Sequence, residues 1–221
     1  MKNSATFTAS DKRERPIEVS YAKALAKIGR TFYQRGWVLG TSGNFSALVS
    51  EAPFRLLITS SGLDKGALDV EQFLQVDSSS TVIEGGGRPS AETSLHLSII
   101  RLRRARAVLH THSVWSTMLS GALSPHGGLT IEGFEMLKGL SGVTTHEHSE
   151  WLPIIGNSQD YDGLAQTLEQ ILNDSPACHG VLLRQHGLYT WGDSIAEAKR
   201  HVEILEFLLE VTGRKFLASR K

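Results

Sequence analysis

The 221-residue chain has little cysteine, with Cys178 as its single copy. One cysteine cannot form an internal disulfide, and such low usage is typical of a reducing compartment. No apolar stretch approaches the ~20 residues that a membrane-spanning helix needs. An excess of charge is also missing, because Lys plus Arg and Asp plus Glu number 23 each. These absences argue against a disulfide scaffold, a membrane protein and a general nucleic-acid binder, and they predict a cytoplasmic protein.

What the chain does have is enough apolar sequence for a sizeable core, at 40% hydrophobic residues. Residues 1–16 are polar and charged and lack the apolar segment of a signal peptide. We predict that residues 1–16 form a flexible arm. Since the remainder contains no internal repeat and no low-complexity linker, we predict a single domain over residues 17–221.

The spacing of apolar residues predicts helices alternating with short strands. Helices are expected over 18–35, 91–103, 114–120, 134–140, 160–173 and 195–211. Strands are expected over 45–49, 55–59, 73–76 and 81–83, in the apolar run that ends at the histidine pair near 110, and from 181. Ser90 is expected to cap the helix that starts near residue 91. This mixture predicts an α/β or α+β fold in three layers.

A histidine pair, His110 and His112, ends an apolar run that is expected to be a strand. Because a strand turns alternate side chains to the same face, both imidazoles point the same way and could bind one divalent metal ion. A hydrogen-bonded or solvated pair is equally compatible with this pattern. His186, at the end of a later strand, is the natural third ligand. His146 and His148 form a rival pair, but their neighbourhood predicts a flexible loop.

Three loops combine hydroxyl side chains with glycine or other small residues, at 41–44, 59–62 and 89–92. Backbone N–H groups and hydroxyls in such loops can cradle a phosphate, although ordinary turns have the same composition. Glu92, expected in the first turn of a helix, could complete a metal shell, act as a base or complement the helix dipole. Its position in the sequence does not separate these roles.

Five motifs, in this order and at this separation, resemble the class II aldolase and adducin family over about residues 18–212. They are TSGN at 41–44, SSG at 60–62, PSAE at 89–92, HTH at 110–112 and QHG at 185–187. The resemblance implies a three-layer α/β/α fold around a central, largely antiparallel sheet. It also implies one zinc ion per subunit, held by His110, His112 and His186, and a homotetramer with active sites near subunit interfaces.

Within this family, the segments EMLKG at 135–139 and GLYTWG at 187–192 look most like those of dehydratases. That likeness implies that Glu135 is the acid/base carboxylate. Glu92 falls where the aldolases of the family keep their catalytic glutamate and where some dehydratases carry a cysteine, so both glutamates are candidate catalytic residues. The phosphate-binding residues implied are Gly43, Asn44, Ser61, Gly62 and Ser90.

The implied activity is a zinc-dependent dehydration of 5-methylthioribulose 1-phosphate to a 2,3-diketone in methionine salvage. An aldolase or epimerase that acts on fuculose or ribulose phosphates is the alternative on the same scaffold. A non-catalytic, adducin-like interaction module is a further alternative, but such a module has no reason to keep three histidines. The expected partner is a small sugar phosphate, with no nucleic acid or membrane.

Overall fold

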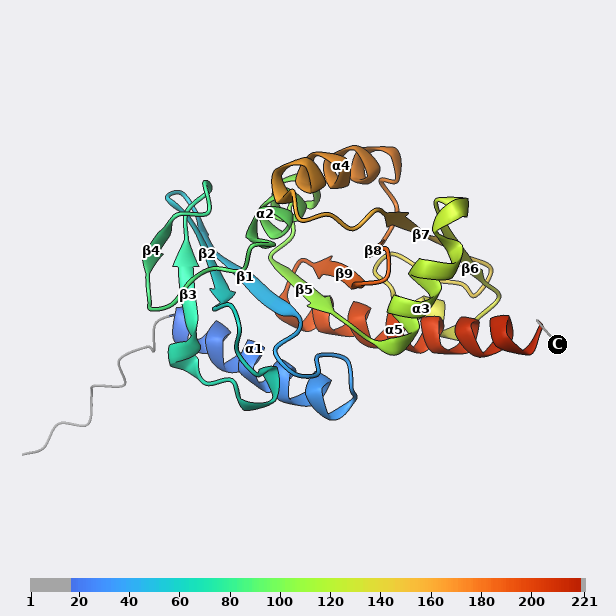
Figure 1. Ribbon diagram of the computed structural model, residues 1–221, viewed down its shortest axis with the longest axis horizontal. Helices are drawn as coiled ribbons and strands as arrows, with labels where there is room; N and C mark the ends of the chain where they lie inside the picture. Colours follow the sequence, from blue (N-terminus) through green and yellow to red (C-terminus); the bar gives the residue numbers. More distant parts are fainter. Residues whose placement is uncertain (1–16, 220–221) are drawn as a thin grey trace, which may run out of the picture.

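A computed structural model of the chain describes residues 17–219 (Figure 1). The predicted arm, residues 1–16, lies outside the described residues. Within the described part, nine strands form one sheet in the order β4-β3-β2-β1-β5-β9-β8-β7-β6. Every neighbouring pair is antiparallel except β7 and β8, which are parallel. The predicted largely antiparallel sheet is therefore confirmed.

The strands are short, and most coincide with the predicted segments. They are β1 (Asn44–Glu51), β2 (Phe54–Thr59), β3 (Phe73–Val76), β4 (Val82–Glu84), β5 (Ala107–Thr111), β6 (Gly128–Glu132), β7 (Ser149–Ile155), β8 (Gly180–Leu183) and β9 (Gly187–Gly192). The hairpin of β6 and β7 was not among the predicted strands. Its outward positions carry polar and aromatic residues, so the apolar pattern there is weak.

Five α-helices and four 3₁₀ turns complete the described chain. The α-helices are α1 (Ile17–Gln34), α2 (Thr93–Arg103), α3 (Val114–Leu123), α4 (Tyr161–Asp174) and α5 (Ile195–Ala218). The 3₁₀ turns are η1 (Lys65–Ala67), η2 (Val70–Gln72), η3 (Ser124–His126) and η4 (Glu135–Gly139). The predicted helix at 134–140 is thus a 3₁₀ turn, and α5 extends beyond residue 211, where Gly213 lies against Trp115 and Met118 of α3.

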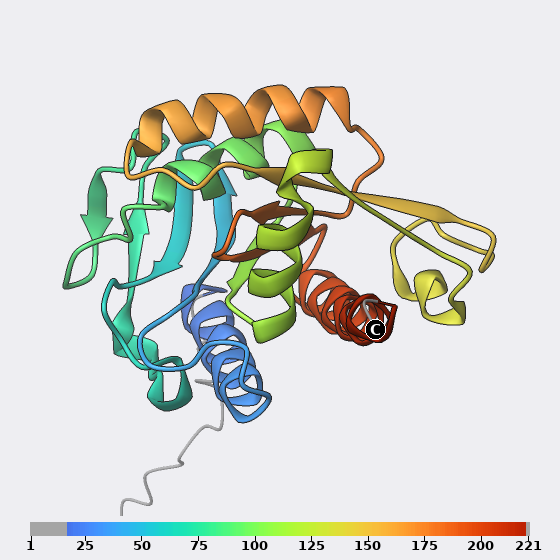
Figure 2. The same cartoon turned by 45° about the vertical axis from the view of Figure 1, so that its right-hand side comes forward.

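The helices cover both faces of the sheet, which confirms the three-layer architecture (Figure 1, Figure 2). One core lies between the sheet and the helices α2 and α4. On the other face, α1 and the start of α5 form a second core, and α3 with the rest of α5 forms a third. Strand β5 contributes to both faces, with Val108 toward α2 and Leu109 toward α1. It lies between β1 and β9 in the middle of the sheet.

Candidate active site

Strand β5 delivers the first two histidines of the candidate site. His110 is fully buried, and its Nδ1–H donates to the carbonyl oxygen of Leu188 on β9 at 3.0 Å. The ring of Tyr189 stacks on the His110 ring with 3.8 Å between centroids. His112, which immediately follows β5, donates its backbone N–H to the carbonyl oxygen of Trp37 at 2.7 Å. These contacts hold the His110 ring and the His112 backbone, and His110 presents Nε2 as a lone pair toward the site.

The third histidine, His186, comes from the turn between β8 and β9. A Cβ on Gly187 would lie 2.0 Å from the carbonyl oxygen of Thr111, so only glycine lets this turn lie against β5. The Nδ1–H of His186 donates to Asn157 Oδ1 at 3.3 Å, which leaves Nε2 free for the site. Strand pairing between β5 and β9 thus brings together residues that are far apart in the sequence.

The Nε2 atoms of the three histidines converge on one point. They lie 2.8 Å apart for His110 and His112, 3.1 Å for His112 and His186, and 3.3 Å for His110 and His186. Nitrogen ligands of a tetrahedral zinc ion stand about 3.3 Å apart. Burial, reinforced by the neighbouring imidazoles, lowers the pKa of His112 to about 3 and that of His110 well below its ordinary value. Three neutral rings with facing lone pairs fit a divalent metal ion.

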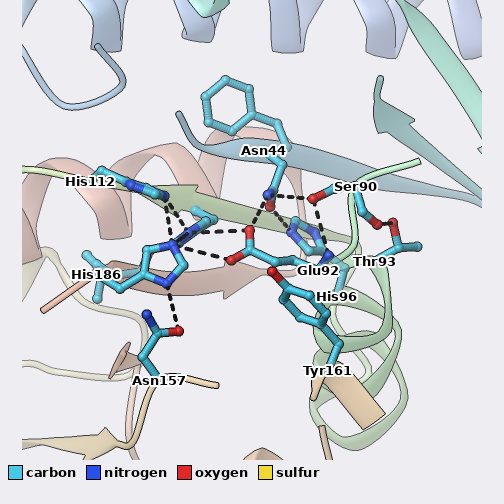
Figure 3. Close-up of polar contacts among 12 residues, drawn as sticks. Asn44, Ser90, Glu92, Thr93, His96, His112, Asn157, Tyr161 and His186 are labelled. Atoms are coloured by element: carbon cyan, nitrogen blue, oxygen red, sulfur yellow. Dashed lines mark hydrogen bonds and ion pairs between the residues drawn. The ribbon is translucent and has the colours of Figure 1, made fainter. Parts of the chain in front are cut away.

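A carboxylate, that of Glu92, lies beside this cluster (Figure 3). Its oxygens are 3.3 Å from His186 Nε2 and 3.7 Å from His110 Nε2. We predicted Glu92 in the first turn of α2, but it immediately precedes the helix. There it makes no capping hydrogen bond. Ser90 is not the cap either, since its hydroxyl accepts from the backbone N–H of Glu92 at 3.2 Å. The carboxylate therefore faces the histidines and not the helix end.

A chain of buried polar groups holds Glu92 in place. Asn44 donates from Nδ2 to Glu92 at 2.6 Å and to the hydroxyl of Ser90 at 3.2 Å. The Nε2–H of His96 donates to Asn44 Oδ1, and Ser46 donates to His96 Nδ1 at 2.7 Å. Burial lowers the pKa of His96 to about 3, so the ring stays neutral. Sequence reasoning missed His96, although its position four residues after Glu92, on the same face of α2, could have revealed it.

The three small-residue loops meet around one cavity of about 290 Å³, next to the histidines. Gly43 has a φ of +75°, and a Cβ there would lie 2.7 Å from the His110 carbonyl oxygen, so loop 41–44 can approach β5 only as glycine. The lining includes all five predicted phosphate-binding residues, together with Glu92 and two of the three histidines. These residues are Gly43, Asn44, Ser61, Gly62, Ser90, Glu92, His112 and His186. A buried lysine, Lys65, also lines the cavity and was not singled out from the sequence.

Glu135 lies apart from this cavity. It is exposed on η4, where its carboxylate contacts Lys138 and His146. The hydrogen bond from Lys138 lowers the pKa of Glu135. Figure 2 draws η4 next to the β6 edge of the sheet, well away from loop 41–44. Within one chain, the structure does not bring Glu135 together with Glu92 or the three histidines.

The rival histidine pair does not converge in the structure. His146 is exposed and faces Glu135, whereas His148 Nε2 meets the buried carboxylate of Glu150 at 2.8 Å. His179 joins the same carboxylate from the other side, with 2.9 Å between Nδ1 and Glu150 Oε2. The loop therefore contributes one histidine to a different cluster.

None of the helices within residues 17–219 has the length and apolar character that a membrane span requires.

Comparisons with known proteins agree with this fold. Residues 23–212 match the family model of the class II aldolase and adducin N-terminal domain, so the chain belongs to this family. The structure is similar to that of an L-fuculose-1-phosphate aldolase from Thermus thermophilus, with a TM-score of 0.73 and 23% identity over 92% of this chain and 99% of that one. The predicted family and fold class are thus confirmed.

Curated relatives narrow the likeness further. The chain is 44% identical over 197 residues to the methylthioribulose-1-phosphate dehydratase of Pseudoalteromonas translucida, covering 86% of this chain and 92% of the relative. It is 41% identical over 193 residues to the protein of the same name from Sorangium cellulosum, covering 86% and 90%. The chain is therefore similar in sequence to enzymes of one particular activity over most of its length.

Proposed function

We propose that this chain dehydrates 5-methylthioribulose 1-phosphate to a 2,3-diketone phosphate, as part of methionine salvage. The observation that carries the proposal is a cavity in which a metal-binding histidine cluster, the Glu92 carboxylate and three phosphate-type loops meet. The names of the curated relatives support the choice of substrate. We further propose that the metal is zinc, that the enzyme works in the cytoplasm and that it forms a homotetramer.

The residues around the cavity suggest how the substrate is held. In the proposed complex, the loops at 41–44, 60–62 and 90 bind the C1 phosphate through hydroxyls and backbone N–H groups. His110, His112 and His186 would hold the metal ion next to C2 and C3. When bound, that ion supplies positive charge for oxygen atoms that become negative as C3 loses its proton. Phosphate binding at one end of the cavity thus places the reacting carbons near the histidines.

We assign removal of the C3 proton to Glu92. Its carboxylate lies within 3.7 Å of two histidine nitrogens, and the hydrogen bond from Asn44 keeps it aimed at them. The electrons of the C3–H bond then expel the C4 hydroxyl, which takes up a proton and leaves as water. The remaining enol gains a proton at C4 and loses the proton of its C3 hydroxyl, which gives the diketone. This sequence needs one base and one acid on the substrate.

We assign the acid role to Glu135 of the partner subunit, where burial in the neighbouring cavity would have to raise the pKa that Lys138 lowers in the isolated chain. Glu135 is exposed in its own chain and remote from that chain's cavity, which is the placement expected of a residue that completes a neighbouring site. Subunit mixing tests the assignment. Glu92→Gln and Glu135→Gln homo-oligomers should both be nearly inactive, whereas co-assembled oligomers should regain activity. Mixed oligomers without any recovery would mean that both carboxylates serve one chain.

A substrate panel tests the function as a whole. Zinc-loaded protein is incubated with methylthioribulose 1-phosphate, fuculose 1-phosphate or ribulose 5-phosphate, with chelator-treated protein as the control. We expect the diketone from the first substrate and little reaction with the others. Release of dihydroxyacetone phosphate and an aldehyde would favour the aldolase alternative, which the position of Glu92 also suits. The adducin-like module is disfavoured because the chain keeps its histidine cluster.

A further inference from the structure

A lysine is buried at the floor of the candidate cavity. Lys65 is only 1% exposed, which is rare for a side chain that carries a full charge. Its Nζ donates to the carbonyl oxygen of Leu63 at 2.7 Å and to that of Thr41 at 3.1 Å. An ammonium group has three N–H bonds, so two carbonyl acceptors leave one N–H for a further partner.

These two carbonyl oxygens belong to different loops. Thr41 starts the loop at 41–44, and Leu63 follows the loop at 60–62. Lys65 therefore ties together two of the three segments that line the cavity. A side chain that only held the two loops together would need N–H donors but no charge. This role alone does not explain why a charged ammonium group is buried here.

The charge of the cavity lining supplies the explanation. Among the described lining residues, Lys65 is the one lysine, and there is no arginine. The loops offer hydroxyls and backbone N–H groups, which are dipoles without net charge, and Glu92 adds a negative charge. A phosphate monoester carries about −1.5 to −2 charges at neutral pH, and burying it without a cation is costly.

We infer that Lys65 is the cation that neutralises the phosphate group of the substrate. This inference rests on the proposed function only in taking the ligand to be a phosphorylated sugar. Burial lowers the pKa of Lys65 to about 8, against the opposing effect of nearby Asp64, so the group is still mostly protonated at neutral pH. The charge of Lys65 is therefore present in the cavity at neutral pH. A bound phosphate dianion would favour the protonated form further.

Three variants separate the charge from the structural tie. Lys65→Gln keeps an amide that can donate to both carbonyls but removes the charge. Lys65→Arg keeps the charge, and Lys23→Met removes an exposed lysine on α1 as a matched control. In steady-state kinetics, Lys65→Gln should raise KM at least tenfold while kcat changes by less than about threefold, because the contact is equally strong in ground and transition states. Lys65→Arg should recover most of this loss, and Lys23→Met should show none.

Calorimetry with inorganic phosphate tests the inference without turnover. Zinc-loaded wild type should bind phosphate, and Lys65→Gln should bind it at least tenfold more weakly with the same metal content. The ¹⁵N resonance of the Lys65 ammonium in the wild type, which needs no substitution, should shift on phosphate addition. Equal phosphate affinity in Lys65→Gln, or an unmoved resonance, would overturn the inference. Loss of phosphate binding in Lys65→Gln alongside turnover of a different sugar phosphate would uphold it while refuting the proposed substrate.

Discussion

Two histidine clusters in this chain contain the same residue types but differ in where their protons can go. Around His110, His112 and His186, three Nε2 atoms face one another within 3.3 Å. Around His179, Nδ1 faces Glu150 at 2.9 Å and Nε2 faces the carbonyl oxygen of Ser141 at 2.8 Å. The first cluster turns its nitrogen lone pairs toward a common point. In the second, each ring N–H of His179 has an oxygen acceptor.

His148, Glu150 and His179 also lie close enough together to hold a metal ion, but their contacts favour a buried ion pair. Burial on its own lowers the pKa of His179, but the hydrogen bonds to Glu150 and Ser141 outweigh it and raise the pKa. Burial likewise opposes ionisation of Glu150, and the bonds from His179 and His148 still lower its pKa. We therefore expect the number of proton acceptors, more than the number of histidines, to decide which cluster binds a metal ion.

The largest expected effect is loss of metal from the first cluster alone. His112→Ala should lose most of its bound metal and about 10³-fold in kcat, because the ion supplies several kcal/mol of charge stabilisation. The matched variant His148→Ala should keep about one ion per chain. Elemental analysis and activity assays of both proteins provide the check. Two ions in the wild type, falling to one in His148→Ala, would erase the distinction between the clusters.

The next effect contrasts the two carboxylates. Glu92→Gln should lower kcat about 10²-fold with the metal retained, since it removes a base at the reacting carbons. Glu150→Gln should leave kcat nearly unchanged because Glu150 lies outside the cavity. Kinetics on metal-loaded proteins measure both. If Glu150→Gln lost as much activity as Glu92→Gln, the second cluster would have a catalytic role.

For stability, we expect Glu150→Gln to have a larger effect than Glu92→Gln, the opposite of their order in kcat. Glu150→Gln should lower the free energy of unfolding by about 2–3 kcal/mol, because it leaves a buried imidazolium without its counter-ion. Glu92→Gln should cost about 1 kcal/mol or less, since Gln can still accept the bond from Asn44. Urea unfolding of the two variants and the wild type gives these values. An equal cost for both would mean that Glu150 is no more important to the fold than the cavity residue.

The smallest effect is on the pH dependence of stability. His179 faces Glu150, Glu197, His201 and the Ser141 carbonyl, and its pKa is raised in the folded state. The contribution of His179 to the free energy of unfolding is therefore complete below the unfolded-state pKa of about 6.5. It is lost as pH rises through the folded-state pKa. Glu150, whose pKa is lowered, contributes above its unfolded value and loses this as pH falls through the folded one.

The free energy of unfolding of the wild type should accordingly exceed that of Glu150→Gln by more at pH 6 than at pH 9. The histidines with lowered pKa values are present in both proteins, so the difference between the two isolates the pair. Urea unfolding at both pH values measures it. A difference that grows toward pH 9 would reverse the assignment of charge to His179.

Local patterns in the sequence were enough for the first half of the metal site. The alternation of a strand places His110 and His112 on one face, and the structure has both on that face. The contribution of His186 depends on the pairing of β5 with β9, a long-range contact that no local pattern encodes. Its place at a strand end made His186 the natural third candidate, and the resemblance to a known family implied that it joins the other two.

Other features could not be read from local patterns because tertiary packing creates them. A lysine after a turn is ordinarily a surface residue, and Lys65 is buried because its backbone lies against Gly29 of α1 and its ammonium reaches the Thr41 carbonyl oxygen. His148 sits in the predicted loop, yet Glu150 on the unpredicted strand β7 anchors it. Glu135 was assigned to the site from its motif alone, and a single chain places it elsewhere. Each depends on contacts between segments distant in the sequence.

The path of the chain through the middle of the sheet has a consequence for biosynthesis. Two candidate ligands lie on β5 and directly after it, whereas the third, His186, follows His110 by 76 residues. A nascent chain that has just exposed His110 and His112 can offer an ion only two nitrogens. Tight capture therefore waits until β6, β7 and β8 have been translated and the turn before β9 has emerged from the ribosome. Loading with metal would then report that both halves of the sheet have been synthesised.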